Sequence, residues 1–395
     1  MLYIYNIIIK IYGFAIKIHS LHNQKSKQWI DGRKDIFLRL GKEIKNDKNI
    51  IWFHCASHGE YEQVNNLISQ YKNNFPKDKI LLTFFSPSGF NNVKQHKNID
   101  WKFYLPLDTK TNAKKFIQLV MPKKVFFVKS ELWYNYMNQL SFYKIPLYHV
   151  SSIFKKEKFS TRSSFSAEML SKSKHFFVQD KNSSDVLNNI NIKNTSIIGD
   201  TRFDSILENI KNKKEDQRIL EFCLDKTTII FASVWAEDEH IFKKFIKENS
   251  QYKFIIAPHE LNYCKNISKF FDVELYSEFD TPSEKNILLI NKIGILKNIY
   301  KYCSLAYIGG GFGKGIHNII EASANLKPVV FGPNHSQFIE AKDLIKINGA
   351  ASVNNYKEFL SQFNKLNSSF NKKAVSDYIK DKSGATDHII QHLKV

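Results

Sequence analysis

The sequence predicts an α/β protein built from two Rossmann-like domains that face a cleft, preceded by an amphipathic membrane-associating helix. Short apolar runs alternate with mixed stretches of about 10 to 20 residues, as in the strands and helices of a parallel sheet. The runs form two series, and a charged stretch without strand signal, residues 206–218, separates them. A chain of 395 residues is long enough for two such cores. In open sheets of this kind, ligands bind beyond the carboxyl ends of the strands.

The predicted strands define the domains. The first series comprises Ile50–Cys55, Ile80–Phe85, Lys124–Val128, Leu147–Val150, His175–Val178 and Ser196–Ile198. The second series comprises Thr228–Ala232, Phe254–Ala257, Ile287–Ile290, Leu305–Ile308 and Pro328–Phe331. We therefore expect a membrane-associating segment at 1–22, one domain at 23–205 and a second at 206–395.

The first 18 residues are mostly apolar, but a single polar stripe interrupts them at helical spacing. The stripe consists of Asn6, Lys10, Gly13 and Lys17. A membrane-spanning helix needs about 20 apolar residues, so the segment is short for one, and it lacks the small residues of a cleavable signal. The pattern favours a helix that lies in the membrane interface, with Lys25, Lys27, Arg33 and Lys34 near anionic headgroups. The alternative is an ordinary first helix packed on the core.

The charge balance points to an anionic partner. Lys and Arg number 58 against 38 Asp and Glu, a formal net charge of +20. Arginine, which nucleic-acid readers favour for bidentate contacts, is scarce, so we expect an anionic membrane surface and no nucleic acid. The four cysteines lie far apart and form no Cys-x-x-Cys pair. Neither a zinc ribbon nor a disulfide framework is therefore expected, and a reducing compartment fits.

A glycine cluster, Ile308–Asn318, follows an apolar strand and precedes a predicted helix at Asn318–Ala324. Glycines let the backbone approach a ligand closely, and a helix start offers free N–H groups to an anion. The spacing fits neither Gly-x-Gly-x-x-Gly nor a Walker A loop. Glu321, one turn further on, is placed to accept hydrogen bonds from ribose hydroxyls. The pattern favours a nucleotide-sugar site over a flexible loop with a helix cap.

Carboxylates follow two first-series strands. Glu60 comes shortly after Ile50–Cys55, where a helix dipole would keep it ionised as a general base; the alternative is a plain helix-start charge. Glu131 follows Lys124–Val128, and Arg202, after the strand ending at Ile198, would suit an anionic substrate. No metal site is expected, because the adjacent His54 and Cys55 point to opposite faces of a strand.

Taken in order, these segments resemble the Kdo transferases (3-deoxy-D-manno-octulosonic acid transferases of lipopolysaccharide synthesis), over roughly Leu2 to Ala350. The resemblance rests on an ordered set of motifs. The matching segments are Ser57–Glu60, Ser86–Gly89, Tyr104–Asp108, Glu131–Trp133, Gly199–Asp204, His317–Glu321 and Gly332–Asn334.

The resemblance implies a GT-B fold, no metal and no cofactor. It implies inverting transfer of Kdo from CMP-Kdo to a lipid A precursor (lipid IVA) at the cytoplasmic face of the inner membrane. Glu60 would be the proton acceptor, while Glu131 and Arg202 would stabilise the transition state. Residues 23–205 would bind the acceptor through Ser57, Gly59, Ser88 and Gly89. Residues 206–395 would bind the donor through Pro258, His259, Gly294, Gly310, Gly311, His317, Asn318, Ile319, Ile320 and Glu321.

The chain departs from the family pattern at the donor site. Ala257 stands before Pro258-His259 without the family's Arg, Ile295 replaces a Glu after Gly294, and Ile319 replaces a Pro. Two alternatives stay open. Another GT-B glycosyltransferase, using a different nucleotide sugar, would keep the glycine loop and Glu321 but would not predict the Glu60 and Glu131 motifs together. A non-catalytic nucleotide-binding membrane-surface protein would not need Glu60.

Overall fold

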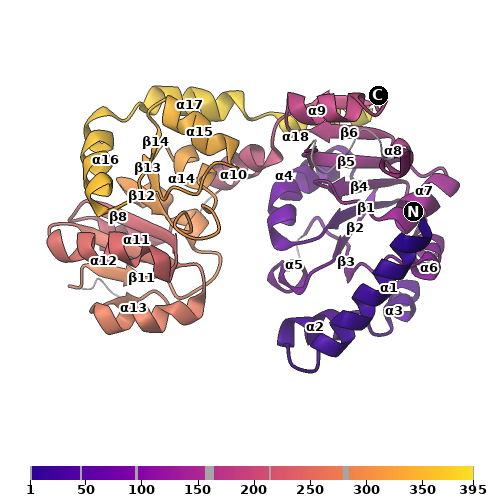
Figure 1. Cartoon of the computed structure of the whole chain (residues 1–395), viewed down its shortest axis with the longest axis horizontal. Helices are drawn as coiled ribbons and strands as arrows, with labels where there is room; N and C mark the ends of the chain where they lie inside the picture. The colour runs from indigo at the N-terminus through magenta and orange to yellow at the C-terminus, as the bar shows by residue number, and fades with distance from the viewer. Residues whose placement is uncertain are drawn as a thin grey trace. The chain divides into compact units, whose positions relative to one another are not determined.

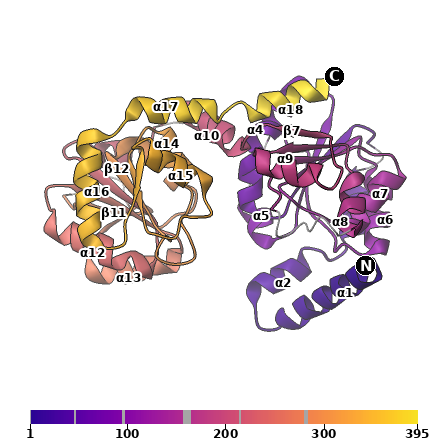
Figure 2. The same cartoon turned by 45° about the horizontal axis from the view of Figure 1, so that its top comes forward.

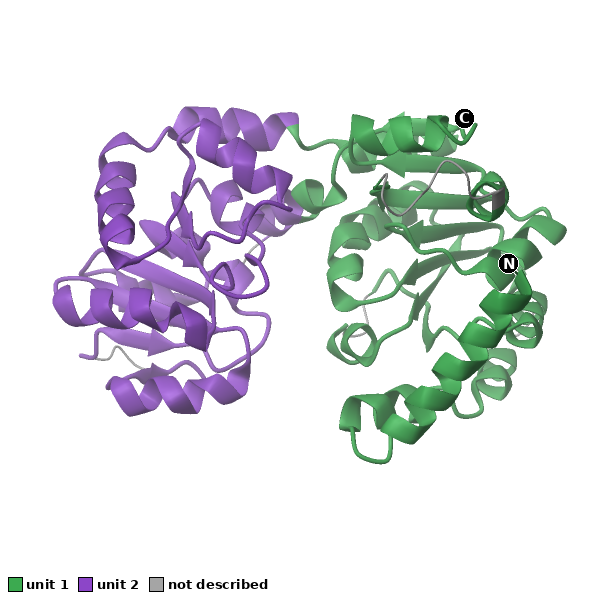
Figure 3. Cartoon of the chain, in the orientation of Figure 1, with its two compact units in different colours: residues 1–205, 382–395 green, residues 206–381 purple. Residues whose placement is uncertain are grey.

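The computed structural model describes residues 2–44, 47–93, 97–155, 164–212, 215–278 and 284–394. The chain divides into two compact units (Figure 3). Unit 1 comprises residues 1–205 and 382–395, and unit 2 comprises residues 206–381. Each unit is an α/β structure around one parallel sheet, as the alternation of apolar runs predicts.

Unit 1 contains a seven-stranded parallel sheet in the order β3-β2-β1-β4-β5-β6-β7 (Figure 1). Its strands are β1 (Ile50–Cys55), β2 (Lys79–Phe84), β3 (Trp101–Tyr104), β4 (Lys124–Val128), β5 (Leu147–Ser152), β6 (His175–Val178) and β7 (Thr195–Ile197). Its helices are α1 (Leu2–His19), α2 (Gln24–Asp31), α3 (Ile36–Ile44), α4 (His58–Asn74), α5 (Pro87–Asn92), α6 (Lys110–Val120), α7 (Tyr134–Phe142), α8 (Ser164–Ser171), α9 (Lys181–Asn188) and the start of α10 (Thr201–Lys211).

The central strands of unit 1 are apolar along their whole length because both faces of the sheet are covered. Successive side chains point to opposite faces, so Trp52 and Phe127 join one core cluster while Phe53 and Phe126 join the other. The carboxyl ends of β1, β2 and β4 lie side by side in the sheet order. The segments that follow these three strands therefore meet at one edge.

Unit 2 contains a second seven-stranded parallel sheet, ordered β10-β11-β9-β8-β12-β13-β14. Its strands are β8 (Thr228–Val234), β9 (Lys253–Pro258), β10 (Glu274–Leu275), β11 (Ile287–Leu289), β12 (Leu305–Ile308), β13 (Val329–Phe331) and β14 (Ala350–Ser352). Its helices are α11 (Gln217–Cys223), α12 (Glu239–Glu248), α13 (Cys264–Phe270), α14 (Ile320–Ala324), α15 (Ile339–Lys346), α16 (Tyr356–Ser369) and α17 (Lys372–Asp381).

The last helix, α18 (Ala385–Lys394), packs on unit 1, which differs from the predicted second domain at 206–395. Ile389, Ile390 and Leu393 join the core cluster around Phe53. The Asp204 carboxylate accepts hydrogen bonds from the N–H groups of Gly384 (2.6 Å) and Thr386 (2.7 Å) at the start of this helix. The pattern of an amphipathic helix does not indicate which core the helix covers. The sequence therefore did not predict that α18 packs on unit 1.

All eleven predicted strands form, with bounds that differ by at most two residues. The prediction missed the three short strands β3, β10 and β14, which lie at the outer edges of the two sheets. The predicted connection at 206–218 is largely helical in its described part, because α10 runs through the unit boundary and α11 begins at Gln217.

Helix α1 lies beside α2 (Figure 2) and packs on unit 1 through the face that carries part of the polar stripe. The Asn6 amide oxygen accepts a hydrogen bond from the Asn135 side chain at 2.9 Å. A side chain at Gly13 would collide with Leu107, because a Cβ there would lie 2.6 Å from it. In contrast, Ile8, Ile11 and Phe14 are more than half exposed. Among the described residues, no helix has the length and apolar character needed to cross a membrane.

Candidate active site

Glu60 lies in the first turn of α4, directly after β1. Its Oε2 atom accepts hydrogen bonds from the N–H groups of Ala56 and Ser57, the latter at 3.3 Å. The side chain is only 7% exposed, and burial raises the pKa of the Glu60 carboxyl. The charge of Lys129 and the two N–H groups oppose that rise, so the site can hold Glu60 in its ionised form.

Glu131 follows β4, the strand next to β1 in the sheet. Burial first, and then the charge of Glu60, raise the pKa of Glu131 to about 8. Lys129 opposes this rise and adopts a left-handed backbone conformation with φ of 59°. For a lysine this conformation is uncommon, and backbone strain of this kind gathers at functional sites.

The two carboxyl groups therefore behave as an interacting pair. Each carries less charge when the other is ionised, as in carboxylate pairs that share one proton. Glu60 has the two backbone donors, which favour the negative charge on Glu60 and, when the pair holds one proton, that proton on Glu131. Such an arrangement supplies one base and one hydrogen-bond donor at the same sheet edge.

A buried network of hydrogen bonds holds Trp133 in place and so supports the loop that carries Glu131. The Trp133 indole N–H donates to His54 Nε2 at 3.1 Å, and His54 Nδ1 bonds to Thr83 Oγ1 at 2.9 Å. Complete burial lowers the pKa of His54 to about 3, so the ring stays neutral. Trp52 also donates to Thr83 Oγ1 at 2.7 Å. Sequence reasoning considered His54 only as a metal ligand and missed this supporting role.

The predicted acceptor residues lie at the starts of α4 and α5, beyond the adjacent strands β1 and β2. Ser57 is the N-cap residue of α4, and Gly59 has open space where a side chain would be. The Ser88 hydroxyl lies 2.9 Å from that of Ser86. A Cβ on Gly89 would lie 2.3 Å from the Phe84 ring, so this position requires glycine. These residues and the carboxylate pair thus share one end of the sheet.

Arg202 forms an ion pair with Asp200, whose Oδ2 lies 2.6 Å from Nη2 of the guanidinium. Asp200 Oδ1 also accepts a hydrogen bond from the Arg202 backbone N–H at 2.9 Å. An anionic substrate would therefore meet a cation whose charge is partly compensated. The proposed stabilising role of Arg202 stays a prediction.

The glycine loop of unit 2 is tightly folded after β12. Gly310 has φ of 88°, a conformation that favours glycine. A Cβ on Gly311 would lie 2.6 Å from the backbone N of Gly332, so two backbones meet here without side chains. The helix after the loop begins at Ile320, two residues later than predicted. The Asn318 side chain accepts a hydrogen bond from the Ile320 N–H at 3.1 Å, which delays the first turn.

Three aromatic rings stack beside this loop. Trp235 and His317 lie side by side, with centroids 6.1 Å apart, and the His259 ring stacks on both, with centroids 4.5 Å and 4.2 Å away. The Trp235 N–H donates to His317 Nε2 at 2.8 Å. Burial, together with His259, lowers the pKa of His317 to about 4, so both rings are neutral near pH 7. Flat neutral rings of this kind offer a stacking surface for a base or sugar.

Sequence reasoning missed Trp235 and Asp238, although both follow β8 at the same sheet edge as the loop. The buried Asp238 carboxylate accepts hydrogen bonds from the N–H groups of Trp235 (2.9 Å) and Gly310 (3.1 Å) and from the Tyr307 hydroxyl (2.7 Å). It therefore ties the glycine loop to the ring stack. The available signal for Asp238 was a carboxylate that follows a predicted strand. The prediction used this signal only for the first series of strands.

The remaining predicted donor residues surround the loop. Pro258 ends β9, Gly294 has φ of 87°, and Ile319 and Ile320 are buried. Glu321 is partly buried; burial first, and then the charge of Glu321, raise the pKa of Tyr300. Within the described parts of the chain, no three His, Cys, Asp or Glu side chains gather as metal ligands.

Two parallel α/β sheets with these loops at their edges define a GT-B-like fold, and solved structures share it. The chain superposes on a putative UDP-N-acetylglucosamine 2-epimerase from Listeria monocytogenes with a TM-score of 0.61, at 12% identity over 88% of this chain and 96% of that one. It superposes on MurG from Acinetobacter baumannii with a TM-score of 0.53, at 11% identity over 88% and 99% of the two chains. At this identity the likeness shows the fold alone.

Sequence comparison relates the chain to one family of enzymes. Residues 34–205 match the family model described as 3-deoxy-D-manno-octulosonic-acid transferase (Kdo transferase). The chain is 25% identical to the 3-deoxy-D-manno-octulosonic acid transferase of Rickettsia bellii, over 86% of this chain and 84% of that protein. It is 26% identical to the enzyme of that name from Aquifex aeolicus, over 82% and 88%. Along most of its length the chain is similar to Kdo transferases, which are glycosyltransferases, and the family model matches its residues 34–205.

Proposed function

We propose that this protein transfers Kdo from CMP-Kdo to a lipid A precursor, lipid IVA, with inversion at the anomeric carbon. The observation that carries the proposal is the Glu60–Glu131 pair, in which burial raises the pKa of both carboxyls and the charge of Glu60 raises that of Glu131 further. The pair supplies a base and a proton-bearing partner at the carboxyl ends of β1 and β4. The names of the relatives at 25% and 26% identity support the choice of sugar.

In this proposal Glu60 takes the proton from a hydroxyl of the acceptor sugar. The hydroxyl oxygen forms a bond to the anomeric carbon of Kdo as the bond from that carbon to the CMP phosphate oxygen breaks. CMP leaves with the electron pair of the broken bond. Protonated Glu131 donates a hydrogen bond to negative charge on the sugar acid, while Arg202 attracts the same charge. Attack and departure on opposite faces invert the anomeric centre.

Unit 2 is the proposed donor site. We assign the phosphate to the glycine loop around Gly310 and Gly311, and the ribose hydroxyls to Glu321. The stacked rings of His259 and His317 offer a flat neutral surface to the cytosine or the sugar. The buried Asp238 keeps the loop in its folded shape, since it bonds to the Gly310 N–H.

We further propose that unit 1 docks on the cytoplasmic face of the inner membrane through α1. The exposed apolar side chains of Ile4, Ile8, Ile11 and Phe14 would enter the interface. Lys10 and Lys17 on the same helix, with Lys25 and Lys27, would meet anionic headgroups. This location would bring the enzyme to a lipid acceptor.

The test is incubation of the full chain with CMP-Kdo and tetra-acylated lipid A precursor, followed by mass spectrometry of the lipid. We expect the mass of one or more Kdo residues to be added and Glu60→Gln to lose about 10²–10⁴-fold in rate, as for removal of a general base. Glu60→Gln should still bind CMP and fold. Transfer from a UDP-sugar in place of CMP-Kdo would support a different glycosyltransferase, and Glu60→Gln turnover within threefold of wild type would contradict the assigned base.

A further inference from the structure

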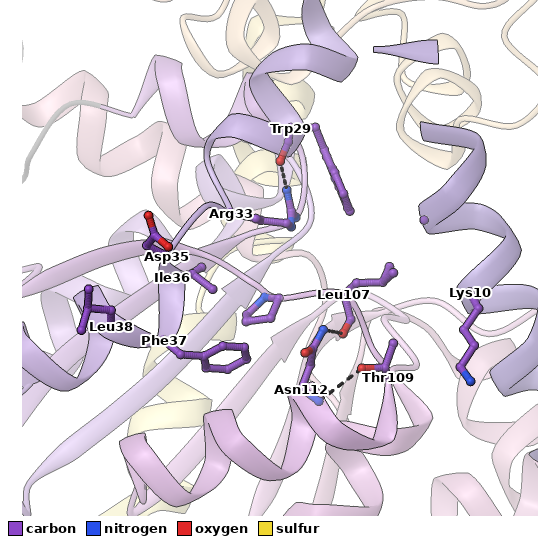
Figure 4. Close-up of a pocket in the computed structure, with 12 residues that line it drawn as sticks. Lys10, Trp29, Arg33, Asp35, Ile36, Phe37, Leu38, Leu107, Thr109 and Asn112 are labelled. Carbon is purple, nitrogen blue, oxygen red and sulfur yellow. Dashed lines mark hydrogen bonds between the residues drawn. The ribbon is translucent and has the colours of Figure 1, made fainter. Parts of the chain in front are cut away.

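A cavity of about 690 Å³ lies in unit 1 between α1, the α2–α3 region and residues 106–112. Figure 4 shows its lining side chains, which come from each of these segments. Its volume falls in the range of about 300–1,000 Å³ that is typical of small-molecule sites. Ile36, Phe37, Leu38 and Leu107 make much of the wall apolar. None of the catalytic or acceptor residues assigned above lines it.

One wall of this cavity carries a partly buried cation without an acidic partner among the described residues. Arg33 donates hydrogen bonds to the carbonyl oxygens of Trp29 (3.0 Å), Phe85 (2.7 Å) and Leu105 (2.9 Å). Burial lowers the pKa of Arg33 to about 9, which still leaves it charged at pH 7. Within the described ranges no carboxylate pairs with it, and Asp35, the carboxylate on the cavity wall, forms no ion pair with it. A cation in this state attracts an anionic group.

Trp29 supplies a second, independent sign of a missing ligand. Its side chain lines the cavity and is 7% exposed. The indole N–H of Trp29 is buried and, among the described residues, has no hydrogen-bond acceptor. Buried donors in native proteins nearly always have a partner, because an unmet donor costs about 1–3 kcal/mol. An oxygen atom of a ligand would meet this donor.

The position of the cavity indicates which ligand brings that oxygen. Lys10 and Gly13 of α1 line it, while the neighbouring Ile11 and Phe14 are 61% and 65% exposed. The cavity thus lies under α1, and the other face of this helix carries the exposed apolar side chains. On its other side, the Trp29 ring lies 5.6 Å from Phe85, whose ring lies 4.8 Å from Trp133 in the Glu131 loop. A ligand here would reach from the apolar surface toward the carboxylate pair.

We propose that this cavity binds one acyl chain of the lipid acceptor, with a carbonyl or phosphate oxygen of that lipid at Trp29 and Arg33. The inference rests on the proposed function, since it takes the acceptor to be an acylated, phosphorylated sugar. The apolar wall shields the acyl chain from water. The Arg33 guanidinium and the Trp29 N–H bind the polar end of the lipid. This site selects acylated acceptors over their bare sugar backbones.

The test measures tryptophan fluorescence of the full chain in detergent with a lipid A precursor that carries brominated acyl chains. Bromine quenches a tryptophan only at contact, so wild type should lose more fluorescence than Trp29→Phe. Leu107→Phe fills the cavity, and Leu38→Asp charges an exposed part of its wall. Each should raise the lipid concentration needed for half-maximal quenching at least tenfold. Leu119→Phe and Leu119→Asp are the matched controls on the exposed face of α6 and should behave like wild type.

Equal quenching in wild type and Trp29→Phe, or unchanged quenching in both Leu107→Phe and Leu38→Asp, would overturn the proposal. Equal quenching by brominated phosphatidylglycerol would also overturn it, because the site would then hold bulk lipid. In a parallel transfer assay, Leu38→Asp should raise the KM for acylated acceptor at least tenfold and leave the KM for the deacylated disaccharide bisphosphate unchanged. Quenching that persists without any Kdo transfer would reject the proposed function and keep the acyl site.

Discussion

The Tyr5 hydroxyl of α1 donates a 2.5 Å hydrogen bond to the Asp108 carboxylate, which also binds the N-terminus of α7. The second and third partners of Asp108 are the backbone N–H groups of Asn135 (3.1 Å) and Tyr136 (3.0 Å). Asp108 is fully buried, and burial raises its pKa to about 6. Helix α7 begins three residues after Glu131, so the Asp108 carboxylate connects α1 to the segment that carries the proposed transition-state stabiliser.

Tyr5→Phe should destabilise unit 1, because it removes one donor from a buried carboxylate. A hydrogen bond to a charged group contributes about 1.5–3 kcal/mol. Asp108 is ionised in the folded protein only above about pH 6, so the loss in free energy of unfolding should be larger at pH 8 than at pH 5. Urea unfolding at both pH values measures it, with Tyr3→Phe, at a 79% exposed position, as the control. An equal, small loss for both variants would show that the bond contributes nothing.

Glu131→Gln should stabilise the protein at high pH. The pKa of Glu131 rises from 4.5 to about 8 in the folded state. Between these values the folded protein binds more protons than the unfolded chain, so wild-type stability falls as pH rises from about 4.5 to 8. Glutamine has no proton to lose, and the variant should therefore gain Tm relative to wild type as pH is raised from 5 to 9. Glu278→Gln, at an exposed position, should show no such gain.

The pKa of Glu131 also predicts how the rate of transfer depends on pH. The proposed mechanism needs Glu60 ionised and Glu131 protonated, so kcat should fall as pH rises through about 8. In Glu131→Gln the amide keeps a hydrogen-bond donor at every pH, and this alkaline fall should disappear even if the maximum rate drops. A fall that persists in Glu131→Gln would assign the titration to another group.

The sheets and the positions of the two candidate carboxylates could be predicted from the sequence because each depends on local pattern. A buried parallel strand such as Ile50–Cys55 is apolar throughout, and a carboxylate that follows it reaches the sheet edge by topology alone. The three missed strands are two to four residues long, and each contains a polar residue, Lys102, Glu274 or Ser352, so none is a continuous apolar run.

Long-range pairing could not be predicted in the same way. The bond of Tyr5 to Asp108, the packing of α18 on unit 1 and the stack of Trp235 on His259 join residues far apart in the chain. The polar stripe on α1 was visible, but the sequence could not tell that Asn6 and Gly13 lie on the packed side. That face is fixed by the partners Asn135 and Leu107, which the helical period does not specify.

Charges on the exposed face of α1 should release the protein from membranes without unfolding it. Ile8 and Ile11 are 57% and 61% exposed, so Ile8→Glu with Ile11→Glu removes little packing inside unit 1. Each carboxylate would have to leave the interface or be neutralised there. We expect at least tenfold weaker binding to vesicles that contain phosphatidylglycerol, measured by sedimentation, and a Tm within 2 °C of wild type, roughly the effect of a neutral surface change.

The matched control for α1 is Ile197→Glu on β7, where the side chain is 55% exposed. It adds one negative charge to the same unit at a comparably exposed isoleucine. Vesicle binding of this variant should stay close to that of wild type. If Ile197→Glu and the α1 variant lost binding equally, net charge rather than the α1 surface would govern the interaction.

Glu321→Ala should raise the KM for CMP-Kdo more than it lowers kcat. Glu321 lies in the first turn of α14, after the glycine loop, and its carboxylate is partly buried. Ribose contacts change little between ground and transition states, so losing them removes mainly uniform binding. A charge-assisted hydrogen bond contributes about 1.5–3 kcal/mol, or roughly 10–150-fold in affinity.

The competing explanation makes Glu321 a structural acid beside the buried Tyr300, whose pKa it raises. Under that explanation Glu321→Ala would change stability and leave CMP affinity alone. Calorimetric titration of CMP into wild type, Glu321→Ala and Glu321→Gln separates the two. The glutamine variant keeps a neutral acceptor of the same size, so it should recover part of the CMP affinity if the carboxylate binds ribose. Unchanged CMP affinity in a well-folded Glu321→Ala protein would exclude the ribose role.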